Sequence, residues 1–127
     1  MKNDSFIIGT GSFLPEKVLS NNDLEKMVDT SDEWITTRTG IKTRRISGVG
    51  EEASKIAVKA AREALEDAQV SPKEIDLIVV GTISSEMSMP SCACLVQKDL
   101  GAVNAYAYDL NAACSGFLYS LELAASY

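Results

Sequence analysis

The sequence of 127 residues contains no histidine and only three cysteines, so several common kinds of site are excluded from the start. A structural zinc site needs clustered cysteine and histidine ligands, and Cys92 and Cys94 have no second pair to complete one. An odd number of cysteines also gives no disulfide framework. We therefore predict a reducing, cytoplasmic setting and no bound metal.

Long apolar runs are also missing. No stretch approaches the roughly 18–20 apolar residues that cross a bilayer, and the N-terminus has no apolar signal-peptide core. The formal net charge is −6, so the chain as a whole should repel nucleic acids and anionic membranes. An apolar content of 46% is nevertheless ordinary for a globular protein, and the length fits one domain.

Several stretches have the spacing and the end signals of helices. The clearest is 53–68, where apolar side chains recur three and four residues apart and charged residues occupy most of the other face. Serine or asparagine at the start, and glycine at the end, are typical of helix caps. On these signals shorter helices begin at Asn21 or Asn22, run from Ser31 to Gly40, and run from Ser91 to Gly101.

Strand patterns lie between the helices. Residues 77–81 form a continuous apolar run, as expected of a parallel strand that is covered on both faces. Residues 6–15 predict a first strand that ends at a proline turn, and 105–109 predict a last one. Because strands alternate with helices, the sequence predicts an α/β fold with a mainly parallel sheet and right-handed crossovers.

The most informative segment runs from Asp109 to Tyr119, where an apolar strand leads through small residues and one cysteine into an amphipathic helix. Cys114 is expected at or just before the first turn, where unpaired N–H groups and the helix dipole favour a thiolate. Its small neighbours permit a tight turn and leave room for a substrate carbonyl. The pattern predicts a nucleophile elbow with sulfur in place of oxygen. A small, inert, buried cysteine is the alternative that spacing alone leaves open.

A cluster of positive charge stands out in this acidic chain. Arg38, Lys42, Arg44 and Arg45 place four cations within eight residues. A solvated surface cluster is the simpler interpretation, and a site for phosphate-bearing ligands is the alternative.

Taken together, five motifs resemble the N-terminal part of the β-ketoacyl-acyl-carrier-protein synthase III family, the initiating condensing enzymes of bacterial fatty-acid synthesis. They are GTGSFLP at 9–15, NDL at 22–24, DTSDEWI at 29–35, RTGI at 38–41 and NAACSGF at 111–117. The resemblance covers essentially the whole chain, in order. It implies a thiolase-like fold with the layers α-β-α-β-α, of which residues 1–127 are most of the N-terminal half. The chain is accordingly expected to be a truncated one.

The resemblance also implies an activity. An acyl group would move from coenzyme A (CoA) to Cys114, and a decarboxylating malonyl-carrier protein would then attack the thioester. The substrates are acyl-CoA and malonyl-acyl-carrier protein, no cofactor is needed, and the enzyme is a cytoplasmic homodimer. The backbone N–H of Cys114 would supply half of an oxyanion hole. The family's histidine and asparagine, which act in decarboxylation, have no counterpart in these 127 residues.

Four further residues match positions to which the family gives a role. Trp34 matches a tryptophan that stacks on the adenine of CoA, Arg38 a cation near the CoA phosphates, and Thr30 a polar contact to the base. Met89 matches the residue, often phenylalanine, that crosses the dimer interface and closes the partner's acyl pocket. Packing within the chain is an alternative explanation for Met89.

Other functions share parts of this pattern. The cysteine elbow also occurs in 3-hydroxy-3-methylglutaryl-CoA synthase and in enzymes that prime polyketides. A half-length chain that pairs with a full-length subunit would be a non-catalytic interaction protein. The third alternative is a structural domain with an inert cysteine.

Overall fold

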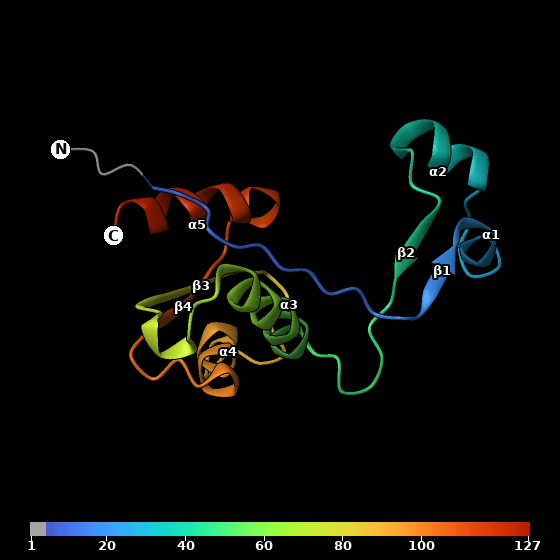
Figure 1. Cartoon of the computed structure of the whole chain (residues 1–127). Coiled ribbons are helices and arrows are strands. Elements are labelled where there is room, and N and C mark those ends of the chain that lie inside the picture. The colour runs from blue at the N-terminus through green and yellow to red at the C-terminus, as the bar shows by residue number, and fades with distance from the viewer. Residues whose placement is uncertain (1–4) are drawn as a thin grey trace. The chain divides into compact units, whose positions relative to one another are not determined.

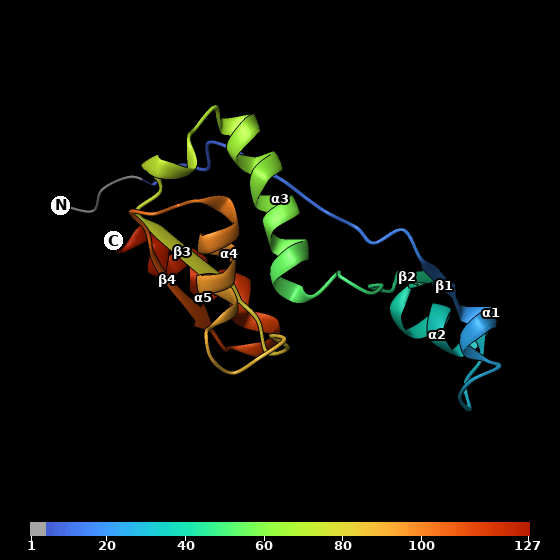
Figure 2. The same cartoon turned by 90° about the horizontal axis from the view of Figure 1, so that it is seen from below.

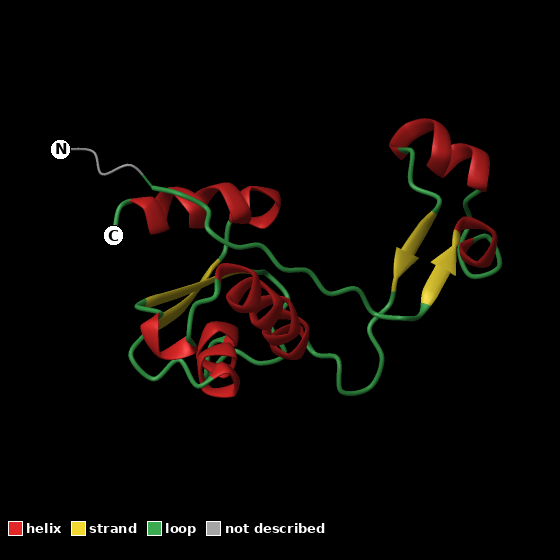
Figure 3. Ribbon diagram, in the orientation of Figure 1, coloured by secondary structure: helices red, strands yellow, loops and turns green. Residues whose placement is uncertain are grey.

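A computed structural model describes residues 5–127, which belong to two compact units. The larger unit contains the chain up to Phe13 and the range Glu52–Tyr127, and the smaller unit is Leu14–Glu51. Figure 1 labels their elements and Figure 3 separates helices from strands. Each unit is described here by itself.

The larger unit is built on two parallel strands, β3 (Leu77–Gly81) and β4 (Tyr106–Leu110), with Leu77 opposite Tyr106 and Gly81 opposite Leu110. Three helices cover this pair: α3 (Ala53–Ala68), α4 (Cys92–Leu100) and α5 (Gly116–Ala125). Helices α3 and α4 lie side by side on one face and α5 lies on the other (Figures 1 and 2). The predicted α/β class with parallel strands is confirmed.

The core of the larger unit lies between the strands and the α3–α4 face. Helix α4 supplies three deeply buried residues, Cys92, Ala93 and Val96, which are at most 2% exposed, and Ala102 just after the helix is fully buried as well. Alternate residues of β3 point to opposite faces, so Ile78 and Val80 pack on this core. Both faces of β3 are therefore covered, as its continuous apolar sequence predicts: one face by α3 and α4, and the other by α5.

The predicted strand at 6–15 is wrong for the described chain. These residues run extended beside α3 and pair with no strand. Their amide groups are taken by helix side chains, because Thr10 N–H donates to Asp67 at 2.9 Å and Ser12 N–H donates to Glu63 at 2.7 Å. The apolar residues that suggest a strand are present, but none of the strands within residues 5–127 pairs with this segment.

The smaller unit is an antiparallel pair of short strands with two helices. The strands are β1 (Val18–Ser20) and β2 (Thr43–Arg45), and the helices are α1 (Asn21–Leu24) and α2 (Asp32–Thr39). Ser20, and neither Asn21 nor Asn22, caps α1 in a reciprocal pair of hydrogen bonds with Asp23. The predicted cap, Asn21 or Asn22, is therefore one or two residues too late. The side chain of Asn21 makes other hydrogen bonds, which are described with the site.

Two short 3₁₀ turns, η1 (Pro72–Glu74) and η2 (Ala113–Ser115), complete the elements. Within residues 5–127 no helix is long and apolar enough to cross a membrane. The same residues contain no group of three or more side chains placed to hold a metal ion.

Candidate functional site

Cys114 lies on the turn that joins β4 to α5. The turn is η2, and α5 begins at Gly116, two residues after Cys114. The Ser115 N–H donates to the Ala112 carbonyl at 2.9 Å, and Ala113 has the left-handed φ of 44°. The side chain of Cys114 is exposed. The predicted position at the start of the helix is confirmed, with a tight and locally strained turn that small residues tolerate.

A close backbone contact fixes where this turn sits. Gly81, the last residue of β3, lies so near α5 that a Cβ there would be 3.2 Å from the Gly116 carbonyl carbon and 3.3 Å from the Ser120 hydroxyl oxygen. Such a contact is tighter than nine in ten real Cβ contacts, so a side chain at position 81 would require α5 to shift by a few tenths of an ångström. The end of β3 therefore determines the position of the first turn of α5.

The three cysteines have different environments. Cys92 is fully buried, and burial raises the pKa of its thiol to about 11, with the charges of Glu86 and Asp109 acting in the same direction. Cys94 is half-buried, and its sulfur accepts a hydrogen bond from Ser91 at 3.2 Å. Of these three thiols, all within the described residues, Cys114 alone is exposed. Accessibility thus separates the predicted nucleophile from the other two.

Met89 lies in the loop between β3 and α4, and its side chain is 87% exposed. Packing within the described chain therefore does not explain this methionine. The same loop is attached to α3 by Glu86, whose carboxylate accepts hydrogen bonds from the hydroxyl and the N–H of Ser54. Burial raises the pKa of Glu86, but the hydrogen bonds from Ser54 and from the backbone of Glu86 itself, together with the charge of Lys55, hold the pKa below its usual value.

The smaller unit presents an exposed aromatic and cationic pair. Trp34 is 54% exposed, and the guanidinium carbon of Arg38 lies 4.8 Å from the centre of its ring. The two residues are one helical turn apart on α2, which Ser31 caps and Gly40 ends as predicted. Thr30 is half-buried directly before that cap. An exposed indole with a guanidinium on it is suited to stacking on a flat, negatively charged ligand.

Asn21 holds α2 in place from the centre of the smaller unit. It is 1% exposed, and its amide group donates to Asp32 at 2.7 Å and to the Ile41 carbonyl at 2.8 Å. Its side-chain oxygen accepts from Arg44 at 2.7 Å. All its polar atoms are therefore satisfied, and its contacts join α1, α2 and β2.

The cluster of four cations is not one site. Arg44 donates to Asn21 and to the Leu19 carbonyl, and Arg45 donates to the Pro15 carbonyl at 3.0 Å. These two arginines hold β2 against the segment that leads into and forms β1. Arg38 lies over the Trp34 ring instead. A site for phosphate-bearing ligands among these cations stays a prediction.

The structure thus distributes the predicted residues over its two units. Thr30, Trp34 and Arg38 lie together in the smaller unit, whereas Met89 and Cys114 lie in the larger one. Sequence reasoning missed the residues that position them. Asn21 was misassigned as a cap, and no sequence signal marked Glu86 or Asp109 as partners of distant helix ends.

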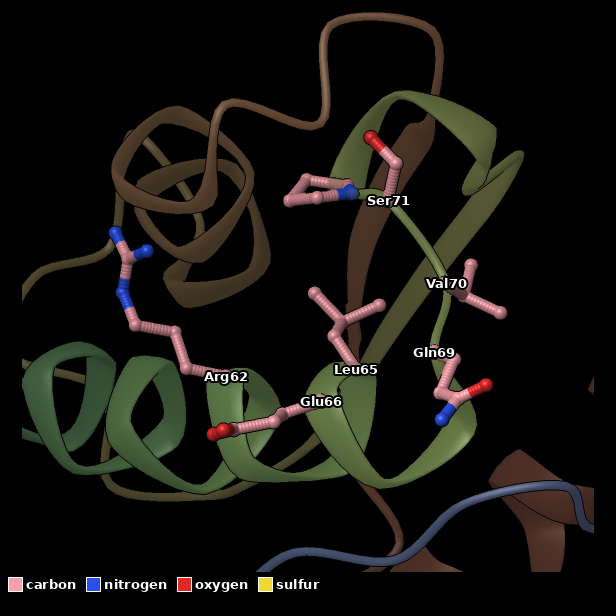
Figure 4. A pocket seen from close by; sticks show the side chains of 7 residues that line it. Arg62, Leu65, Glu66, Gln69, Val70 and Ser71 are labelled. Carbon is pink, nitrogen blue, oxygen red and sulfur yellow. The ribbon is translucent and has the colours of Figure 1, made fainter.

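An open pocket at the C-terminal end of α3 lies apart from these residues. It is lined by Arg62, Leu65, Glu66, Gln69, Val70, Ser71 and Pro72 (Figure 4). Arg62 donates to the Asp99 carbonyl at 2.6 Å, so its charge is already engaged in holding α4 to α3. None of the predicted site residues lines this pocket.

Solved structures with the same arrangement were found. The structure of 3-oxoacyl-acyl-carrier-protein synthase III from Aquifex aeolicus VF5 matches with a TM-score of 0.89 and 58% identity, over 93% of this chain and 38% of that one. A priming β-ketosynthase from the R1128 polyketide pathway matches with a TM-score of 0.90 and 42% identity, over 94% of this chain and 36% of that one. The fold, with its exposed cysteine before α5, is that of the thiolase-fold proteins.

Curated relatives agree, although no family model matches the chain. The β-ketoacyl-acyl-carrier-protein synthase III of Desulfotalea psychrophila is 58% identical over 121 residues, which are 95% of this chain and 37% of the relative. That of Caldanaerobacter subterraneus is 56% identical over the same shares. Nearly the whole chain is thus similar to β-ketoacyl-acyl-carrier-protein synthase III enzymes, and it spans a little over a third of the length of these relatives.

Proposed function

We propose that this chain supplies the nucleophile and part of the CoA site of an acyltransferase that starts type II fatty-acid synthesis. The reaction condenses acyl-CoA with malonyl-acyl-carrier protein. One observation carries the proposal above the others: Cys114 is the exposed thiol of the three, on a tight turn before a helix, in a chain 58% identical to a named synthase III.

Two bond exchanges make up the proposed reaction. The Cys114 thiolate attacks the acyl carbonyl, the carbon–sulfur bond to CoA breaks, and CoA leaves as a thiol after it takes up a proton. The malonyl thioester then loses carbon dioxide, and its α-carbon attacks the acyl-cysteine. The β-ketoacyl-carrier protein forms and the Cys114 thiolate is released. The Cys114 N–H donates to the carbonyl oxygen as negative charge develops there.

The exposed pair in the smaller unit is suited to the nucleotide part of CoA. The Trp34 ring offers a face for adenine, and Arg38 adds a charge that attracts phosphate. Thr30 would contact the base. Met89, exposed in its loop, would close the acyl pocket of a second copy in a cytoplasmic homodimer.

A chimera provides the test of this proposal. Residues 1–127 replace the matching segment in the Desulfotalea psychrophila relative, so that the remaining 63% of that protein supplies everything else. We expect the purified chimera to form β-ketoacyl-carrier protein from acetyl-CoA and malonyl-carrier protein at a rate within about tenfold of its parent, because the two segments share most residues. A folded chimera that neither takes up an acyl group nor condenses would refute the proposal.

Polyketide priming is a second candidate, favoured by the 42% identity to a priming β-ketosynthase. The two functions differ in the acyl primer and the carrier protein and share the first step. The same chimera, offered carrier proteins of both kinds, distinguishes them by which one receives the product.

Replacing Trp34 by alanine is expected to weaken acyl-CoA binding and leave the chemistry intact. Base–aromatic stacking contributes about 1–3 kcal/mol, so KM for acyl-CoA in the chimera should rise roughly 5- to 150-fold while kcat changes little. Trp34→Phe is the matched control, since it keeps an aromatic face and should recover part of the loss. Because Trp34 is 54% exposed, neither change should unfold α2. A collapse of kcat at an unchanged KM would contradict this assignment.

A further inference from the structure

Asp109 makes a contact that the proposed mechanism does not use. It lies on β4 opposite Val80, and its carboxylate accepts two hydrogen bonds from the first two backbone N–H groups of α4. The distances are 2.8 Å from the Cys92 nitrogen and 2.7 Å from the Ala93 nitrogen. A negative charge at this end also complements the helix dipole. The strand that leads to Cys114 is thereby bonded directly to the start of another helix.

The carboxylate pairs two N–H groups that the local cap of α4 does not reach. Helix α4 already has a local cap, because the Ser91 hydroxyl accepts from the Cys94 N–H at 3.3 Å and the Ser91 carbonyl accepts from Leu95 at 3.2 Å. Asp109 instead comes from 17 residues beyond the helix start. Charge-assisted hydrogen bonds are among the strongest that proteins make, so this link is stiff as well as long-range.

The link stands between two parts of the proposed site. Met89 lies three residues before Cys92, and Cys114 lies five residues after Asp109. The intervening turn is tight and includes the left-handed Ala113, so it has little freedom to absorb a shift of β4. Cys92, whose N–H donates to Asp109, is fully buried, and burial raises the pKa of its thiol, with the charges of Glu86 and Asp109 acting in the same direction.

We propose that Asp109 is a positioning residue, which fixes the turn of Cys114 relative to the loop of Met89 by clamping the start of α4. The role in positioning the site rests on the proposed function. The mechanical link itself, from Asp109 to the two regions, can be measured without any assay of catalysis. Loss of the clamp should loosen two regions at once: the N-terminal turn of α4 and the turn from 112 to 116. Loss of a mere cap should loosen the first region alone.

The experiment compares Asp109→Asn with Ser91→Ala in the chain of 127 residues. Asparagine keeps the shape but loses the charge and one acceptor, and Ser91→Ala removes the local cap and leaves the clamp. Hydrogen exchange followed by mass spectrometry reports both regions, with Ser115 and Gly116 as the hydrogen-bonded amides of the turn. The alkylation rate of Cys114 by iodoacetamide, read from its peptide, is the second measurement.

We expect Asp109→Asn to speed exchange about tenfold in both regions and to change the Cys114 alkylation rate severalfold, since one strong hydrogen bond is lost. Ser91→Ala should speed exchange only at the start of α4 and leave Cys114 unchanged. Equal patterns in the two variants, or an unaltered turn in Asp109→Asn, would overturn the clamp. An inactive chimera with both expected patterns would instead count against the proposed function alone.

Discussion

Replacement of Cys114 by alanine should abolish both acyl uptake and condensation in the chimera. The nucleophile of a covalent mechanism has no substitute, and removal of one typically lowers kcat on the order of 10⁴-fold or more. Because the side chain is exposed, the substitution should change the free energy of unfolding very little. The measurement is the transfer of label from radioactive acetyl-CoA to protein, followed by mass mapping of the labelled peptide.

Cys94→Ala is the matched control for that experiment. Cys94 is half-buried and lies on α4, so its replacement removes a second thiol from the same unit. It should leave labelling almost unchanged. Label found on Cys92 or Cys94, or undiminished in Cys114→Ala, would assign the nucleophile elsewhere.

Residues 1–127 alone are expected not to catalyse condensation. Decarboxylation of a malonyl thioester leaves an enolate that needs positioned hydrogen-bond donors, and each such donor contributes about 10²- to 10³-fold to the rate. This chain has no histidine to offer and spans 37% of its relatives. Product formation from acetyl-CoA and malonyl-carrier protein should fall at least about 10³-fold below the chimera.

The state of the isolated chain must be measured alongside that assay. Helix α5 exposes Phe117, Leu118 and Leu121, whose exposed fractions are 71, 65 and 44%. Apolar surface of this kind favours association. Sedimentation at the assay concentration therefore serves as the control, so that inactivity of a dispersed chain is separated from precipitation. Turnover near that of the chimera by the dispersed chain would contradict the prediction.

Local signals in the sequence were enough for the elements whose ends carry caps. Ser31 and Gly40 fixed α2, Ser91 and Gly101 fixed α4, and the apolar spacing fixed α3 as Ala53–Ala68. Each of these signals acts within one turn of the chain. The position of Cys114 before α5 followed in the same way, because the change from small residues to an amphipathic pattern is local.

Pairings between distant residues could not be predicted in this way. Nothing near Asp109 indicates that its carboxylate binds the start of a helix 17 residues earlier. In the sequence, Arg44 and Arg45 look like ordinary surface cations. Their hydrogen bonds to Asn21 and to the Pro15 carbonyl become visible only when β1 and β2 are paired. The 6–15 segment begins with apolar residues typical of a strand, but a strand also needs a neighbour to pair with, and the local sequence does not show whether one is present.

The contact at Gly81 has a consequence for how sequences related to this one should be compared. A side chain at position 81 would press on Gly116, two residues after the proposed nucleophile, although Gly81 itself takes no part in the chemistry. Selection for catalysis should therefore act on position 81 only through the room that a side chain there would take from Gly116. If an alignment shows only glycine at position 81, the cause need not be a role in the reaction. Exchange of Gly81 would displace Cys114 without altering any atom that touches substrate.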